Sequence, residues 1–403
     1  MHHLFLTGVV LLVIVLLLRR KVSMAIVMPV GTVLLAILYR IHPIDAFHSV
    51  IRGLTSPKSL EMTITLALTM VMEYRLRTSG MLRRMVASLS TAIPNKRVVL
   101  AALPAVIGML PSPGGAVFSA PMVAEASDNT HASPEQKALI NYWYRHIWEY
   151  VSPLYPGIIL ASGLTGLSTQ TLFWTHLPFS IAVIAIGALY CFSGIRSDNT
   201  HETIQARMKA FSSFLYTSAP IFFSLLLVVA SNISPAVALC FGVFLLLIMH
   251  RPSLRDLTDI IIHSLSLKAL VMVVGIMVFQ DMLQVTGAVA GIADFFSQSG
   301  LPVVFIILVV PLFAGLLTGL TVGYIGITFP LLIPLMGEGG SLIWLEALAF
   351  ASGFMGVMLS PVHLCLVLTR EYFQADTAIV FKRLIPPSLA VLTAALIPYL
   401  LYR

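Results

Sequence analysis

The amino-acid sequence predicts an all-α polytopic membrane protein made of two inverted-topology repeats, with about 10 full spans. Hydrophobic residues make up 58% of the 403 residues and charged residues only 10%, and the mean hydropathy is +0.95. A soluble core cannot hide that much apolar surface, so we expect the lipid bilayer to surround the chain. The apolar runs are long and continuous, which favours helices over a β-barrel.

Internal duplication predicts the two repeats. Residues 70–153 align with residues 277–361. The register begins at a shift of 207 positions and has drifted by only two where Pro121 falls on Pro330. Many secondary transporters are built from such repeats, with the binding site between them. The predicted divisions are residues 1–196 for the first repeat, 197–210 for the linker and 211–403 for the second repeat.

Each half contains six apolar elements. In the first half they lie near residues 4–18, 22–39, 59–76, 98–124, 141–163 and 171–193. In the second half they lie near residues 211–230, 233–249, 266–284, 302–336, 342–369 and 385–402. The hydrophilic stretch between these two sets joins the halves.

Basic residues in the loops indicate that the two halves face opposite sides of the membrane. In the first half they follow the first and third elements, whereas in the second half they follow the second and precede the sixth. By the positive-inside rule, this pattern predicts inverted halves. Each half then crosses the membrane an odd number of times. One of its fourth and fifth elements must therefore be re-entrant, or the two must cross together.

The N-terminal apolar run, residues 4–18, precedes the basic residues 19–21. A signal peptide has its positive charge before the apolar core and small residues at a cleavage site. We therefore expect a retained span with the N-terminus outside. The expected location is the inner (cytoplasmic) membrane, as a multi-pass protein.

Paired helix breakers mark the predicted site. Pro-Ser-Pro-Gly-Gly at 111–115 and Thr-Gly-Leu-Thr-Val-Gly at 318–323 interrupt the two fourth elements, and Ser-Pro pairs at 152–153 and 360–361 interrupt the two fifth elements. Proline and glycine open a helix. The resulting helix N-termini favour anions, and freed carbonyl groups suit a cation such as Na+. Kinks that only shape packing are the alternative.

The densest polar cluster, residues 141–150, directly precedes the first Ser-Pro pair. On a helix Arg145 and Glu149 share a face, and His146 lies three positions before Glu149. Charged groups within spans are costly and usually mark a pathway or a proton relay. The aromatic residues of the segment leave an alternative, an interfacial belt with a solvated Arg–Glu pair.

The remaining histidines and cysteines carry weaker signals. His363 follows the second Ser-Pro pair and either carries protons or hydrogen-bonds across helices. Eight histidines fall in or beside loops and are interpreted as surface or interface residues: His2, His3, His42, His48, His176, His201, His250 and His263. Cys191, Cys240 and Cys365 lack CxxC spacing and are interpreted as small core residues, not metal ligands or disulfides. The net charge of +7 reflects loops that set orientation, so we expect no nucleic-acid partner.

Several motifs resemble those of a known group. Residues 77–82 and 285–288 resemble the "TG-leucine" signature of the ion-transporter superfamily, which includes gluconate, citrate and dicarboxylate permeases. Residues 360–368 resemble its late motif. Nearly the whole chain, especially 111–120 and 141–156, is similar to an uncharacterised family of that superfamily, domain-of-unknown-function family 401.

The resemblance implies two inverted repeats, each with a re-entrant hairpin and a broken helix, in a homodimer with elevator-like movement. It implies hairpin tips at 111–115 and 318–323 and helix breaks at 152–153 and 360–361. Sodium-coupled dicarboxylate carriers have Ser-Asn-Thr type motifs at both tips. The tips of this chain differ, so the resemblance does not carry a dicarboxylate substrate or Na+ coupling over to it.

The leading prediction is a secondary active transporter of a small organic anion of the carboxylate type, coupled to H+ or Na+, that works by alternating access. The predicted substrate-binding residues are Ser112, Gly114, Gly115, Asn141, Arg145, Ser152, Pro153, Thr318, Gly319, Thr321, Gly323, Ser360 and Pro361. The predicted coupling residues are His146, Glu149 and His363, and no resident cofactor is expected. A flippase of an anionic lipid or lipid-linked substrate is one alternative. An intramembrane enzyme is another, although the sequence has no HExxH, GxSxG or paired-Asp motif.

Overall fold

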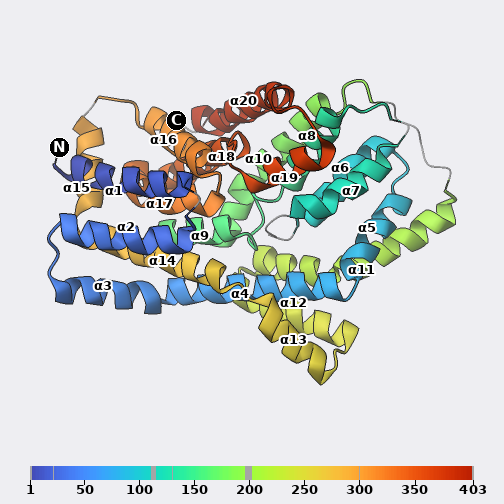
Figure 1. Ribbon diagram of the computed structural model, residues 1–403, viewed down its shortest axis with the longest axis horizontal. Helices are drawn as coiled ribbons and strands as arrows, with labels where there is room; N and C mark the ends of the chain where they lie inside the picture. The colour runs from blue at the N-terminus through green and yellow to red at the C-terminus, as the bar shows by residue number, and fades with distance from the viewer. Residues whose placement is uncertain are drawn as a thin grey trace.

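The computed structural model describes residues 2–20, 22–109, 115–128, 130–195, 202–298 and 300–401. These residues form twenty α-helices (Figure 1). Those of the first half are α1 (His2–Arg19), α2 (Met24–Leu38), α3 (Pro43–Thr55), α4 (Pro57–Thr78), α5 (Met81–Ala92), α6 (Lys96–Ile107), α7 (Gly115–Ala126), α8 (Pro134–Arg145), α9 (Pro156–Thr165) and α10 (Thr169–Cys191). Those of the second half are α11 (Ile204–Ser231), α12 (Pro235–His250), α13 (Leu254–Ser264), α14 (Leu267–Val285), α15 (Ala288–Gln298), α16 (Val303–Thr318), α17 (Thr321–Met336), α18 (Gly340–Met358), α19 (Leu364–Phe373) and α20 (Thr377–Leu401).

The succession of helices in the first half recurs in the second. Each half starts with two apolar helices, a short amphipathic helix and a longer helix that ends before a glycine. That glycine is Gly80 in one half and Gly287 in the other, with φ of 74° and 67°. The left-handed backbone ends one helix and lets the next begin at once. In both halves a hairpin (α6–α7, α16–α17) and a broken helix (α8–α9, α18–α19) follow. The opposite orientation of the two halves in the membrane stays a prediction.

The predicted fourth and fifth elements are each two helices in the structure, so the predicted interruptions are present. The first broken helix is interrupted over a longer segment than predicted. The helix α8 ends at Arg145, well before the Ser-Pro pair, and residues 146–155 form turns. Pro153 and Pro156 both lack an amide hydrogen, so the helix cannot resume until Pro156 takes the first position of α9. The second break is shorter and covers residues 359–363.

Five of the described helices are long and apolar enough to cross a membrane: α10, α11, α14, α18 and α20. Shorter apolar helices of 10–17 residues include α9, α16 and α17. At about 1.5 Å per residue, these are too short to cross a bilayer core of about 30 Å alone. The five long apolar helices indicate a multi-pass membrane protein.

The hairpins and broken helices pack around a common centre. The helix α16 packs along α18 and α6 along α8, while α17 contacts α9, and α19 contacts α7 and α8. A Cβ at Gly108 would overlap the carbonyl oxygen of Arg145, and one at Gly315 would overlap that of Gly353. The same close approach thus occurs in both halves. Beside this centre α14 packs on α2 and α3, and α5 on α11 (Figure 1).

Candidate functional site

The end of α8 contacts elements of both halves. The hydroxyl of Thr321, the first residue of α17, donates to Glu149 Oε2 at 3.0 Å. The amide of Asn141 donates to the carbonyl oxygen of Ala116, at the start of α7, and to Thr369 Oγ1 of α19, at 3.2 and 3.0 Å. Both hairpins and the second broken helix therefore lie around the first helix break.

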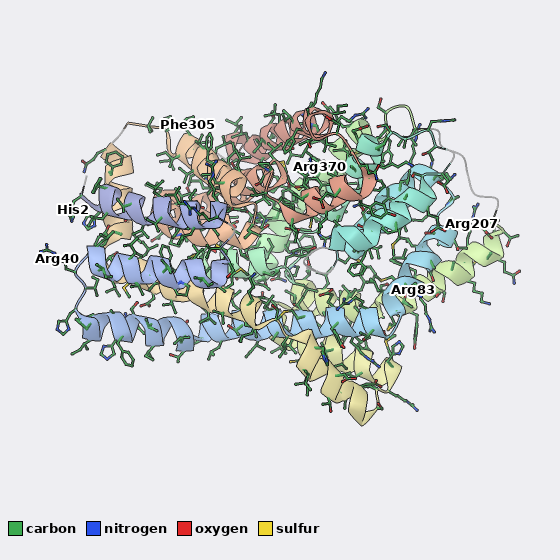
Figure 2. The ribbon with its side chains drawn as sticks, in the orientation of Figure 1. His2, Arg40, Arg83, Arg207, Phe305 and Arg370 are labelled. Atoms are coloured by element: carbon green, nitrogen blue, oxygen red, sulfur yellow. The ribbon has the colours of Figure 1, made fainter. Side chains whose placement is uncertain are left out.

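The polar cluster at residues 141–150 is buried except for Trp148 and Glu149, which are half-buried. Arg145 is 2% exposed and His146 1% exposed. The aromatic residues of the segment that are also buried are Tyr142, Trp143, Tyr144 and Tyr150. The alternative interpretation, a solvated interfacial belt, is therefore wrong. In contrast, Arg40 and Arg83 are exposed and stand at outer edges of the ribbon (Figure 2).

Two histidines, one from each half, meet at the centre of the site. Nε2 of His146 lies 3.1 Å from Nε2 of His363. Nδ1 of His146 lies 2.6 Å from the Tyr142 carbonyl oxygen, and Nδ1 of His363 lies 2.8 Å from that of Gly319. A carbonyl oxygen can only accept, so each Nδ1 carries a proton and donates it. Glu149 Oε1 lies 3.7 Å from His146 Nε2, so three predicted coupling residues form one cluster.

Cys365 joins this cluster. Its sulfur and ring nitrogens of His146 and His363 all lie within 4.8 Å of one another. The interpretation of Cys365 as a core residue alone is therefore incomplete, since it is buried but also lies in a group of potential metal ligands. No local spacing predicts this group, because His146 and Cys365 are 219 positions apart in the chain (365 minus 146).

The tip of the second hairpin carries four predicted site residues. Gly319 ends α16 with φ of 63°, a conformation that side chains disfavour. Thr318 Oγ1 accepts a hydrogen bond from the Leu320 amide at 3.4 Å. Thr321 starts α17 and Gly323 is buried in its first turn. The tip is therefore shaped so that Thr321 reaches the first helix break.

The first hairpin tip lies partly outside the described residues. Ser112 and Gly114 belong to that part of the chain. Gly115 is buried as the first residue of α7. The hydroxyl of Tyr155 donates to the carbonyl oxygen of Gly108, at the end of α6. The first helix break therefore holds the start of this tip.

The two Ser-Pro pairs have different surroundings. Ser152 and Pro153 are both buried within the first break. Ser360 is buried and donates to the Leu316 carbonyl oxygen at 2.7 Å, which ties the second break to α16. Pro361 is exposed. The second break is therefore partly open at the surface of the chain, whereas the first break is buried except for Trp148 and Glu149, which are half-buried.

A second buried pair was not predicted. Nε2 of His176, on α10, lies 2.8 Å from Glu346 Oε2, on α18, and both side chains are 0% exposed. Nδ1 of His176 lies 2.8 Å from the carbonyl oxygen of Tyr150. The interpretation of His176 as a surface or interface residue is therefore wrong. The signal in the sequence is the position of each residue inside an apolar run, where charged groups are costly.

Two cavities open near the C-terminal end of α9, which is its far end from the histidine pair. One has a volume of about 500 Å³ and is lined by residues that include Arg52, Lys58 and Asp281. Arg52 and Asp281 form an ion pair there at 3.0 Å. The other has a volume of about 310 Å³ and is lined by residues that include Lys58, Glu61 and Gly163. Both cavities lie near the C-terminal end of α9, and the histidine pair lies near its N-terminal end.

Known proteins resemble the chain in sequence and in fold. A family model described as "Protein of unknown function (DUF401)" matches residues 3–402. The chain belongs to the DUF401 family. None of the curated proteins matches this sequence. The fold is similar to that of the YdaH transporter of Alcanivorax borkumensis, with a TM-score of 0.56 and 12% identity, over 87% of this chain and 86% of that chain. At that identity the likeness concerns the fold alone.

Proposed function

We propose that this DUF401 protein is a secondary active transporter of a small organic anion of the carboxylate type, coupled to H+ or Na+, that works by alternating access. The observation that carries the proposal is the burial of Arg145, 2% exposed, where helix ends of both halves meet. The transporter fold of the similar structure supports transport rather than catalysis. We therefore propose no enzymatic activity.

Arg145 supplies a permanent positive charge to the site. A guanidinium stays protonated in proteins, and burying it is costly unless an anion compensates the charge. The N-terminal ends of α7 and α17, which contact Asn141 and Glu149, add partial positive charge near the cluster. A carboxylate or a similar small anion is the ligand that this arrangement favours.

The hydrogen bonds of Asn141 narrow the chemical class of the proposed substrate. Its Nδ2 atom donates two hydrogen bonds, to Ala116 and to Thr369. Its Oδ1 atom is buried and makes no hydrogen bond within the described part of the chain. Buried acceptors usually have a donor. A substrate with a hydroxyl or amino group beside its carboxylate would supply one, so we propose a hydroxy or amino acid anion.

The two cavities at the far end of α9 are the proposed entry. Arg52 and Lys58 line the larger one, and positive charge at the mouth of a cavity raises the local concentration of anions. From there the anion would pass along α9 to Arg145 when the hairpins move. Movement is required because Arg145 is buried in this conformation.

The coupling ion and the membrane arrangement belong to the same proposal. Moving one negative charge against 100 mV costs about 2.3 kcal/mol, so uptake of an anion needs a cation, H+ or Na+, in the same cycle. We propose inverted repeats that rock around the site, in a homodimer of the inner membrane with the N-terminus outside. The repeated order of helices and the matched close approaches at Gly108 and Gly315 support two equivalent halves.

A flippase of an anionic lipid or lipid-linked substrate is the second candidate. The observation in its favour is the open second break, where Val362 is 59% exposed and Leu364 50% exposed. These apolar side chains flank His363, which is buried. A lipid tail can stay in the bilayer beside them while its headgroup reaches the site.

Ligand-induced thermal stabilisation of the purified protein distinguishes the two candidates. The panel contains hydroxy acids, amino acids and unsubstituted carboxylic acids, each with and without Na+ and at two pH values, and anionic lipids. A ligand at about 100 times its Kd stabilises the fold by about 2.7 kcal/mol. Stabilisation by a soluble acid supports the transporter, and the Na+ or pH dependence identifies the coupling ion. Stabilisation by anionic lipids alone supports the flippase.

Replacing Arg145 tests its role directly. Arg145→Gln removes the charge and is expected to abolish stabilisation by the anion and to lower uptake into proteoliposomes at least about 10-fold, equivalent to about 1.4 kcal/mol. Arg83→Gln removes an exposed arginine of α5 that lines neither the proposed site nor the proposed entry, and it is the matched control. Full uptake and full stabilisation in a folded Arg145→Gln protein would exclude Arg145 from the anion site.

A further inference from the structure

The contact between His146 and His363 requires a positive ion between the two rings. Each Nδ1 donates its proton to a carbonyl oxygen, so each Nε2 of a neutral ring is an acceptor. Two acceptors that lie 3.1 Å apart repel each other. A shared proton removes this repulsion, and so does a metal ion bound to both nitrogens.

The spacing and the outer hydrogen bonds fit a metal ion. Zn–N bonds of about 2.0–2.1 Å in a tetrahedral site put two ligand nitrogens about 3.3 Å apart. The observed Nε2–Nε2 distance of 3.1 Å is close to that value. Metal-binding histidines typically donate their other N–H to a carbonyl or carboxylate, which directs the free nitrogen at the metal. Both His146 and His363 have this bond, to Tyr142 and Gly319.

Cys365 completes a set of three donors, and Glu149 lies beside His146. The Cys365 sulfur lies within 4.8 Å of both ring nitrogens, and rotation of this side chain can bring it to the spacing of about 3.6 Å that a tetrahedral site requires. Glu149 Oε1 lies 3.7 Å from His146 Nε2. Its other oxygen, Oε2, is held by the hydroxyl of Thr321. Oε1 of Glu149 is thereby left facing Nε2 of His146.

We propose that His146, His363 and Cys365 bind one transition-metal ion, Zn2+ in the first place, with Glu149 as the fourth ligand. Imidazole with thiolate selects Zn2+ and its neighbours over Mg2+ and Ca2+. The thiol proton is released to solvent when the metal binds. The thiolate and the carboxylate then balance the two positive charges of the ion.

The metal joins the two halves of the protein. His146 follows the last residue of α8, and His363 and Cys365 lie at the start of α19. One ion therefore holds the first helix break against the second. This site stands independently of the proposed anion transport, because its test measures metal binding and not uptake.

Titration of the metal-free full-length protein with Co2+ tests the site. A cysteine thiolate on Co2+ gives a charge-transfer band in the near ultraviolet, and four-coordinate Co2+ gives intense visible bands. We expect about one Co2+ per chain, displaced by Zn2+. Cys365→Ser is expected to remove the charge-transfer band and weaken binding at least about 10-fold. Cys191→Ser replaces the other buried free cysteine and is expected to change neither.

Three results of the Co2+ titration would overturn the proposed metal site. Absence of Co2+ and Zn2+ binding to the wild-type protein would overturn it and leave a shared proton between the histidines. A charge-transfer band that persists in Cys365→Ser would also overturn it, because the thiolate would come from elsewhere. If Cys365→Ser does not fold, His363→Gln replaces it. That variant is expected to keep the charge-transfer band and to bind Co2+ at least about 10-fold more weakly, and unchanged affinity would contradict the site.

Discussion

At the scale of single residues, the His176–Glu346 pair is predicted to stabilise the fold strongly. His176 donates to the Tyr150 carbonyl oxygen through Nδ1, so its Nε2 faces Glu346 Oε2 with one proton between them. Glu346→Ala leaves His176 buried without its partner and is expected to cost about 3–5 kcal/mol. Glu346→Gln can donate its amide hydrogen to Nε2, so we expect it to cost clearly less. Thermal or denaturant unfolding in detergent measures both.

The control for this prediction is Glu338→Ala. Glu338 is exposed at the end of α17, so its replacement is expected to change stability by less than about 0.5 kcal/mol. Equal losses in Glu346→Ala and Glu346→Gln would show that the hydrogen bond to His176 contributes nothing beyond the volume of the side chain.

At the scale of helices, two glycines are predicted to set the distance between each hairpin and its broken helix. A Cβ at Gly108 would overlap the carbonyl oxygen of Arg145, and a Cβ at Gly315 would overlap that of Gly353. Backbone cannot yield as a flexible side chain does, so α6 would have to move from α8, and α16 from α18. Gly108→Ala and Gly315→Ala are each expected to destabilise the fold by about 1–3 kcal/mol or more. Unfolding of the purified variants measures this loss.

Gly8→Ala is the matched control, because a Cβ at Gly8, inside α1, meets nothing within 4 Å. Alanine in a helix interior is more favourable than glycine, so we expect a gain of about 0.5–1 kcal/mol. If Gly108→Ala were as stable as the wild type, the contact between α6 and α8 would not be as close as described.

At the scale of the whole molecule, transport is predicted to require movement between α9 and the second hairpin. A Cβ at position 157 would lie 3.6 Å from the Cβ of Thr321. Disulfides join Cβ atoms about 3.5–4.5 Å apart, so Gly157→Cys with Thr321→Cys is expected to form one on oxidation. The double variant is made with Cys240→Ser, which removes the exposed native thiol. We expect oxidation to stop uptake and reduction to restore it.

Comparison of the oxidised and reduced forms of one protein separates the cross-link from any effect of losing Thr321 itself. The single variant Gly157→Cys, treated with the same oxidant, shows whether oxidation alone lowers uptake. Undiminished uptake by the fully cross-linked protein would exclude relative movement of α9 and α17 from the transport cycle.

Local chemistry accounts for the parts of the site that were predicted. Glycine and proline interrupt helices wherever they occur together, so the hairpins and the breaks were found from residues such as Gly319 and Pro153. Burial of Arg145 speaks against a solvated Arg–Glu pair, and the part of the cluster in binding stays a prediction. The early end of α8 at Arg145 was missed, and the prolines at 153 and 156 explain where α9 begins but not where α8 ends.

The sequence by itself determined the helical membrane class and the segments in which most helix breaks lie. These depend on hydropathy and backbone chemistry within a few neighbouring residues. Only the tertiary structure decided that His146 meets His363 and that His176 meets Glu346. The partners are 217 and 170 positions apart. They meet because the two halves pack against each other, and this packing sums many small contacts that no local pattern of residues reveals.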